Sequence, residues 1–224
     1  QQTPLPSFDV QVPLLSLPGI FQTTLETIPG RQPYLKAEPQ LVEQWHTALS
    51  AYPGLKVGIN WQGNAAFLMD RFRSIPLARF APLAKVPGVT LLSVQKKEGL
   101  DQLDQLGGQL GIVDLGRQLD ENSGPFLDTA AVLQNLDVLI TSDTALPHLA
   151  GAMDRPVWVL LSTCSDWRWL EEREDCPWYP SMRLLRQARP GDWEELFARV
   201  ADQLRRVVAG DQALLRPSRR ALGR

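Results

Sequence analysis

The stretch VLITSDTALPHLAG, residues 138–151, decides the fold of this chain. It opens with a mostly apolar run of the kind found in strands that are buried on both faces of a sheet. The run stops at a polar turn, and the residues from Thr144 onward have the composition of a helix. A buried strand that leads directly into a helix N-terminus is typical of parallel α/β sheets.

Three polar side chains of this stretch stand where a helix begins. Asp143 and Thr144 lie at the turn, where capping side chains are favoured, and His148 follows within the first turn and a half. The free amides and the dipole of a helix N-terminus attract phosphate, and an imidazole beside them can donate to a phosphoryl oxygen. The stretch therefore predicts a site for a diphosphate-bearing ligand. Helix capping without a ligand is the alternative reading of Asp143 and Thr144.

The composition excludes several classes of protein. The chain has 224 residues, 44% of them hydrophobic, and a net charge of −2, which gives no nucleic-acid or membrane-surface footprint. No apolar run is long enough to span a membrane, and residue 1 onward lacks the pattern of a signal peptide. Cys164 and Cys176 have no metal-ligand spacing around them. We therefore expect a cytoplasmic protein with reduced cysteines and no partner nucleic acid or membrane.

The chain divides into three parts by composition. Residues 1–38 are rich in Pro, Thr, Ser and Gln and predict an extended crossover or linker segment. Residues 39–210 alternate between strand and helix patterns and predict one Rossmann-like domain, whereas residues 211–224 predict a basic, disordered tail. The expected strands are 55–60, 89–94, 112–115, 138–141, 157–161 and 182–185, and the expected helices are 40–50, 75–86, 99–106, 125–136, 144–153 and 193–208. This order favours the α/β class, with a doubly wound parallel sheet.

Ligands of such sheets bind where the strands end at their carboxyl edge. The polar residues after each strand are therefore the candidates for one shared crevice. They are residues 61–64, Gln95 and Lys96, Gly116, residues 143–148 and residues 162–166. The loop 175–179 has no pattern that points to chemistry.

The ordered series of motifs resembles a known family of enzymes. The motifs are VGINWQGN at 57–64, DRFRSIPL at 70–77, SVQK at 93–96, DTA at 128–130, DTALPHLAG at 143–151, DWRW at 166–169 and PWYP at 177–180. The series is similar to the glycosyltransferase region of bacterial tetratricopeptide-repeat glycosyltransferases, relatives of the heptosyltransferases. The resemblance covers about residues 10–210, and it is specific as a set because each motif alone is weak.

The resemblance implies a GT-B architecture, in which a nucleotide sugar binds between two Rossmann-like halves. This chain corresponds to the C-terminal, donor-binding half, so an acceptor-binding domain is missing and the fragment is expected to be inactive alone. The implied inverting reaction needs no metal or other cofactor, because amides and basic side chains stabilise the leaving diphosphate. Asp143, Thr144 and His148 would hold the diphosphate. Lys96 would add charge, Gln95 would contact the nucleotide, and Gly63 and Asn64 would line the phosphate side.

Three departures from the family pattern fall where the donor should bind. Residues 65–69 read AAFLM where a polar segment is usual, residues 162–165 read STCS, and Pro147 directly precedes His148. They predict a pocket altered by divergence or by engineering. One alternative is a Cys164/His148 pair for ester hydrolysis, with the thiolate as nucleophile and the imidazole as base. Another is a binding scaffold that uses the apolar patch around Phe67.

Overall fold

A computed structural model describes residues 7–29 and 33–218 of the chain. Its centre is one sheet in the order β3-β2-β1-β4-β5-β6, in which every neighbouring pair is parallel. The strands are β1 (Leu55–Asn60), β2 (Val89–Ser93), β3 (Val113–Asp114), β4 (Val138–Thr141), β5 (Val157–Leu161) and β6 (Met182–Arg186). The predicted α/β class with a doubly wound parallel sheet is confirmed.

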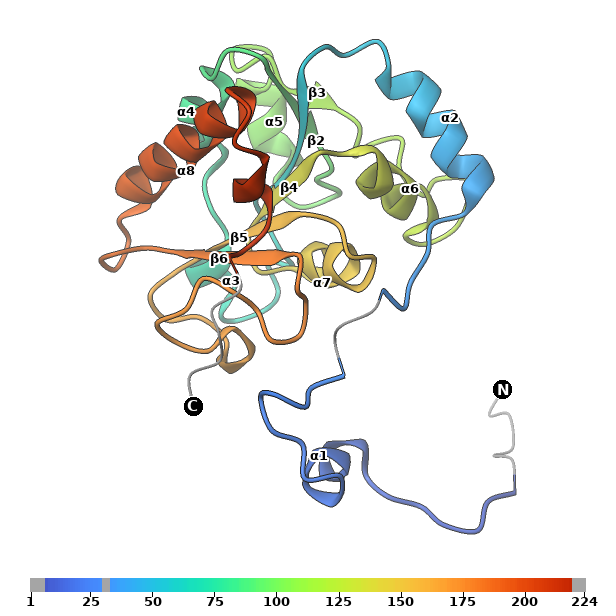
Figure 1. Ribbon diagram of the computed structural model, residues 1–224. Helices are drawn as coiled ribbons and strands as arrows, with labels where there is room; N and C mark the ends of the chain where they lie inside the picture. The colour runs from blue at the N-terminus through green and yellow to red at the C-terminus, as the bar shows by residue number, and fades with distance from the viewer. Residues whose placement is uncertain (1–6, 30–32, 219–224) are drawn as a thin grey trace.

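Helices cover both faces of this sheet (Figure 1). One face packs against α4 (Ala81–Ala84), α5 (Leu100–Leu106) and α8 (Trp193–Val208). The other face packs against α2 (Pro39–Leu49), α6 (Leu127–Asn135) and α7 (Ala145–Ala152). Every residue of β4 and β5 is buried, because both of their faces are covered, and this explains why the two strands are apolar runs without alternation.

The helix expected at residues 75–86 is divided in two. The structure has a 3-10 turn, η2 (Leu77–Phe80), followed by the single α-helical turn of α4. Pro82 has no N–H to donate to the carbonyl four residues earlier, and its ring crowds that carbonyl, so a continuous helix cannot form there. Another single turn, α3 (Asp70–Arg73), lies in the segment between β1 and η2.

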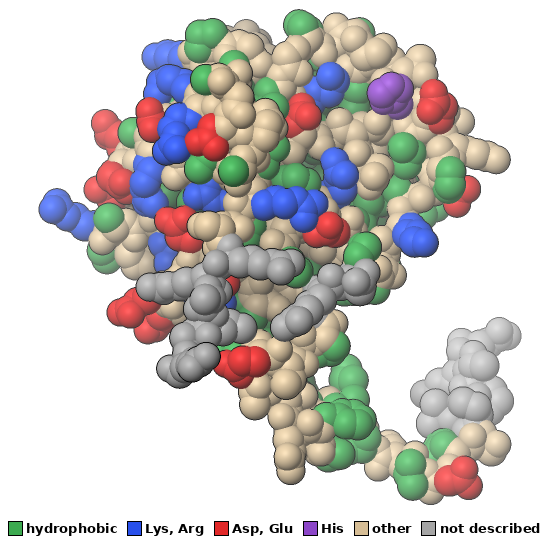
Figure 2. All heavy atoms as spheres, in the orientation of Figure 1, with side chains coloured by type: hydrophobic (Ala, Val, Ile, Leu, Met, Phe, Trp, Pro, Cys, Tyr) green, Lys and Arg blue, Asp and Glu red, His purple; other side chains and the backbone are tan. Residues whose placement is uncertain are grey.

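The N-terminal segment projects from the domain and exposes apolar side chains (Figures 1 and 2). Within residues 7–29 it contains the turns η1 (Leu14–Ser16) and α1 (Leu17–Ile20), which the prediction of an extended segment did not include. Leu15 and Phe21 are 93% and 74% exposed. The segment meets the domain at Tyr34 and Leu35, whose amides both donate to the carbonyl of Ala152 at the end of α7.

The prediction of a disordered tail does not hold for residues 211–218. These residues contain the turn η4 (Gln212–Leu215), and Leu214 and Leu215 pack against the core. The indole of Trp158 donates to the carbonyl of Leu215 at 3.3 Å, and Arg183 donates to the carbonyl of Leu214 at 2.8 Å. The segment is ordered despite its basic composition, because its two leucines pack on the core and their carbonyls accept hydrogen bonds from buried side chains. Residues 219–224 lie outside the described residues.

No helix in the described ranges combines the length and the apolar character that crossing a bilayer requires. The longest amphipathic helix, α8, instead buries one stripe of side chains in the core and leaves the opposite face polar.

The cap of α8 provides a test of local stability. The carboxylate of Asp192 accepts a hydrogen bond from the amide of Glu195 at 3.1 Å, which satisfies one free donor of the first turn. We expect Asp192→Ala to lower the free energy of unfolding by about 1 kcal/mol in urea titrations. Asp202→Ala, on the exposed face of the same helix, is the control and should change stability by less than about 0.5 kcal/mol. Equal effects of the two substitutions would contradict the capping role.

Candidate functional site

The N-terminus of α7 opens at the carboxyl edge of the sheet. The hydroxyl of Thr144 caps the helix by accepting from the amide of Leu146 at 3.3 Å, and it donates to the side-chain carbonyl of Asn60 at 3.0 Å. Pro147 occupies the third position of the helix and has no N–H. The amide of Ala145 is therefore the first-turn donor that neither proline nor capping removes.

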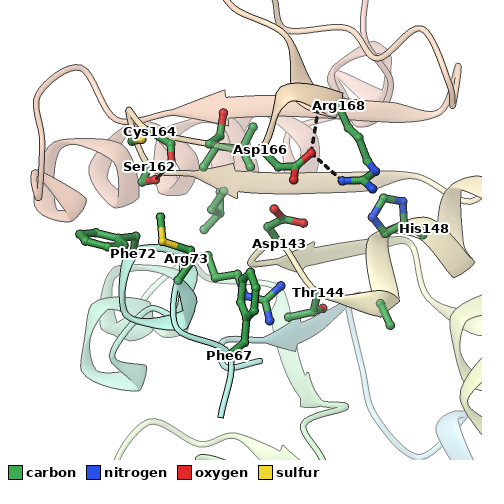
Figure 3. A pocket seen from close by; sticks show the side chains of 15 residues that line it. Phe67, Phe72, Arg73, Asp143, Thr144, His148, Ser162, Cys164, Asp166 and Arg168 are labelled. Carbon is green, nitrogen blue, oxygen red and sulfur yellow. Dashed lines mark hydrogen bonds and ion pairs between the residues drawn. The ribbon is translucent and has the colours of Figure 1, made fainter. Parts of the chain in front are cut away.

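This helix terminus borders a cavity of about 480 Å³ (Figure 3). The first wall is mostly apolar and comes from the segment around α3, with Phe67, Met69, Phe72 and Arg73. The second wall comes from α7 and the loop after β5, and the chain supplies to it Asp143, Thr144, Ala145, His148, Leu160, Leu161, Ser162, Cys164, Ser165, Asp166 and Arg168. The structure thus brings together four of the predicted site residues, Asp143, Thr144, His148 and Cys164.

The imidazole of His148 is held on two sides. Its ring stacks against the buried ring of Trp169, with centroids 5.1 Å apart and 21° between the planes. Its Nδ1 atom lies 3.3 Å from the hydroxyl of Tyr179. Burial lowers the pKa of His148 below its ordinary value of 6.5, and nearby Arg168 acts in the same direction, whereas Asp143 and Asp166 oppose the shift. At neutral pH the ring is therefore an uncharged hydrogen-bonding group.

Both arginines of the cavity already have carboxylate partners. Arg73 is 3.0 Å from Asp70 and lies over the ring of Phe67, with 4.7 Å from the guanidinium carbon to the ring centroid. Arg168 forms an ion pair with Asp166 at 2.7 Å, and a dashed line marks this contact in Figure 3. A guanidinium has five N–H donors, so each arginine can keep its carboxylate and still donate to an anion in the cavity.

Gln95 is a structural residue of the sheet edge. Its side-chain oxygen accepts from Asn60 Nδ2 at 2.7 Å and from the amides of Trp61 and Gln62 at 3.0 Å each. Its nitrogen donates to the carbonyls of Gln62 and Glu98, and only 2% of the residue is exposed. The carboxamide has no free bonding capacity, so the nucleotide contact expected of this side chain does not fit the geometry.

Lys96, Gly63 and Asn64 also lie outside the lining of the cavity. Lys96 Nζ donates to the carbonyl of Leu119 and forms an ion pair with Asp120 at 3.4 Å, both on the β3 side of the sheet.

Gly63 and Asn64 shape the chain next to the cavity. A Cβ at Gly63 would lie 2.6 Å from both Arg73 and Asp70, so the glycine makes room for that ion pair. The side-chain oxygen of Asn64 accepts from the amide of Ala66 and organises the apolar loop at 65–69. In that loop Phe67 and Met69 face the cavity, whereas Leu68 is 80% exposed.

The predicted Cys164/His148 pair is not formed. Figure 3 shows the two side chains at opposite ends of the cavity, and no hydrogen bond joins them among the described residues. Cys164 is an exposed, free thiol, while the nearest partner of the imidazole is Tyr179. A base activates a nucleophile only within hydrogen-bonding reach, and the loop after β5 turns its thiol away from α7.

The sequence reading missed one residue of this site, Tyr179. It lies 31 residues after His148, and the PWYP motif that contains it had no predicted chemical role. Gly151 was the signal that could have indicated it, because a Cβ there would lie 2.4 Å from the ring of Tyr179. A glycine inside a helix, as here one residue before the end of α7, can mark close packing by another group.

Comparisons with known proteins agree with this architecture. No protein-family model matches the chain. Protein FlbA of Caulobacter vibrioides is 31% identical over 202 residues, which are 86% of this chain and 32% of FlbA. Among solved structures, E. coli ADP-heptose LPS heptosyltransferase II has a TM-score of 0.53 at 18% identity, and the match covers 82% of this chain and 53% of the enzyme.

Two further solved structures are similar. A family 9 glycosyltransferase from Veillonella parvula has a TM-score of 0.53 at 15% identity, with 81% of this chain and 53% of that enzyme covered. The E. coli heptosyltransferase WaaC has a TM-score of 0.50 at 15% identity, with 82% and 53% covered. The chain therefore spans about a third of the curated relative and about half of each solved enzyme, and it has the fold of half a heptosyltransferase-like glycosyltransferase.

The bonding of Gln95 predicts a loss of stability. Gln95→Ala would remove the shared acceptor of three buried or half-buried donors, so we expect the free energy of unfolding to fall by about 3 kcal/mol. Gln44→Ala, at an exposed position of α2, is the control and should be nearly neutral. A Gln95→Ala protein as stable as the parent would show that these hydrogen bonds do not hold the sheet edge.

The environment of His148 predicts a dependence of stability on pH. Because its folded pKa is below 6.5, the unfolded chain takes up the proton first as the pH falls, and stability is lost below about pH 6.5. His148→Gln should flatten the slope of unfolding free energy against pH between about 7 and 5, measured without ligand. If His148→Gln kept the slope of the parent, the imidazole would not be the titrating group.

Proposed function

We propose that this chain is the nucleotide-sugar-binding half of an inverting glycosyltransferase, and that its cavity holds the diphosphate of the donor. The observation that carries the proposal is the position of the α7 N-terminus, which opens onto a cavity of about 480 Å³ between an apolar and a polar wall. A nucleotide sugar has the matching chemistry, with a flat base, sugar rings and a charged diphosphate.

The polar wall would bind the diphosphate with donors of three kinds. Ala145 offers a helix amide, His148 offers an uncharged ring nitrogen, and Arg73 and Arg168 offer guanidinium groups that are already oriented by carboxylates. Donors held in place before the ligand arrives lose little freedom on binding. The same donors would stabilise the negative charge that develops on the departing nucleoside diphosphate.

The apolar wall would contact the less polar parts of the donor. Phe67 and Phe72 are 49% and 43% exposed, and both border the cavity. Such rings gain contact area when they cover a base or the apolar face of a sugar. In this proposal the apolar loop at 65–69 is the altered feature of the pocket, and it replaces charge with contact surface beside the diphosphate.

In this proposal, the residues that bind the acceptor sugar belong to a second domain. A heptosyltransferase-like enzyme is about twice the length that this chain covers, so the acceptor wall and the general base would come from a second domain. The isolated chain would bind the nucleotide and transfer no sugar. We also propose that the chain is related to tetratricopeptide-repeat glycosyltransferases. The solved WaaC structure contains ADP, which is consistent with a nucleoside diphosphate ligand here.

Thermal unfolding with a panel of nucleoside diphosphates tests the proposal. UDP, ADP or GDP at about 100 times its Kd would stabilise the chain by about 2.7 kcal/mol, which corresponds to a rise in Tm of about 5–10 °C. Arg168→Ala should weaken the Kd of the bound nucleotide about tenfold, because it removes charged donors from the cavity. Arg79→Ala, outside the cavity, is the matched control and should leave the Kd unchanged. No binding by any member of the panel at millimolar concentration would refute the proposal.

A further inference from the structure

The loop before β6 brings Tyr179 onto α7, next to the cavity. The tyrosine hydroxyl lies 3.3 Å from His148 Nδ1, and the two rings meet edge to face with centroids 5.8 Å apart. This is the nitrogen that points away from a ligand if the other ring nitrogen, Nε2, serves the cavity. The contact therefore acts on the far side of a residue that the site uses.

Gly151 makes this contact sterically feasible. It follows His148 by three residues, so the two positions lie on the same face of α7. A Cβ at Gly151 would lie 2.4, 2.6 and 2.8 Å from three carbon atoms of Tyr179. Without a side chain at 151, the phenol ring can lie against the helix and extend its hydroxyl to the imidazole. Trp169 stacks against the imidazole ring of His148 and restrains it as well.

The available protons limit how these groups bond. Burial lowers the pKa of His148 and raises that of Tyr179, so at neutral pH the imidazole carries one N–H and the phenol keeps its proton. Of the two groups, the phenol O–H is the better donor and the imidazole nitrogen is the better acceptor, so their contact favours donation from Tyr179 to Nδ1.

An anion in the cavity favours the same direction for this hydrogen bond. With Tyr179 donating to Nδ1, the ring proton must be on Nε2, where it can be donated to a phosphoryl oxygen. With the opposite direction, Nε2 would present a lone pair to the negatively charged oxygen, which is repulsive. The charged groups around the ring, Asp143, Asp166 and Arg168, belong to the cavity wall and do not reach Nδ1 by any hydrogen bond found in the described residues.

We propose that Tyr179 is a positioning residue that holds His148 in the tautomer protonated at Nε2, so that the cavity offers an uncharged N–H donor to the ligand's phosphoryl oxygen. The ligand in this statement rests on the proposed function. The tautomer itself is a property of the ligand-free protein. Tyr179 acts only through His148 and contacts no reacting atom.

Nitrogen NMR of the histidine rings measures the tautomer directly. The chain has two histidines, and His46, whose Nδ1 lies 3.2 Å from the side-chain oxygen of Asn135, is an internal reference. In the parent protein at neutral pH, we expect long-range ¹H–¹⁵N spectra to show His148 protonated at Nε2 alone. In Tyr179→Phe, which keeps the ring against Gly151, the form protonated at Nδ1 should become measurable.

Binding provides the second measurement. Tyr179→Phe should weaken the Kd of the best nucleoside diphosphate about fivefold, since part of the population then presents no donor. Tyr52→Phe, a half-buried tyrosine packed near α2, is the matched control for loss of a phenol hydroxyl and should change neither the spectrum nor the Kd.

The outcomes separate the two proposals. A parent protein protonated at His148 Nδ1 overturns the inference, as does a Tyr179→Phe protein with the spectrum of the parent. Equal Kd values for the parent and Tyr179→Phe also overturn it, while the proposed function stands. If no nucleoside diphosphate binds the parent, the proposed function fails, and the spectra of the ligand-free proteins still decide whether Tyr179 holds the tautomer.

Discussion

One chain of side-chain hydrogen bonds ties the site to the sheet. The Thr144 hydroxyl donates to the side-chain oxygen of Asn60, and Asn60 Nδ2 donates to the side-chain oxygen of Gln95. These residues follow or end β4, β1 and β2, which are neighbours in the sheet. Asn60 is 4% and Gln95 is 2% exposed, so the bonds lie in a medium where an unpaired partner would be costly. The chain therefore links the N-cap of α7 to the ends of β1 and β2.

The sequence predicted those features that the backbone alone determines. Parallel strands end at one edge, and a polar turn after the apolar residues 138–141 had to open there, so Asp143, Thr144 and His148 could be placed in one site. The same argument indicated the loop after β5, and four of its residues line the cavity because β5 lies beside β4: Ser162, Cys164, Ser165 and Asp166. Strands that are buried on both faces can be predicted from one sequence, because they appear as continuous apolar runs that fit only the centre of a sheet.

The position of a residue at the edge of the sheet does not predict the direction in which its side chain points. Gln95 and Lys96 were placed correctly at the edge of the sheet, yet Gln95 turns inward to β1 and Lys96 turns to the β3 side. Each finds several partners there, and a sequence pattern does not show which of two nearby sets a polar side chain will satisfy. Tyr179 was missed for a different reason, because its contact with α7 spans 31 residues and the PWYP motif does not indicate which residue it meets.

The electrostatics of the cavity follow from groups that are already paired. Arg73 and Arg168 each have a carboxylate within 3.0 Å, and His148 is uncharged at neutral pH. The cavity therefore has little excess positive charge with which to attract an arbitrary anion. What distinguishes it is that an amide, an imidazole ring and two forked guanidinium groups from different elements line the same cavity. Recognition of this kind depends on the spacing of the ligand's oxygens more than on its charge, so the hydrogen bonds that orient the donors determine selectivity as much as the donors themselves.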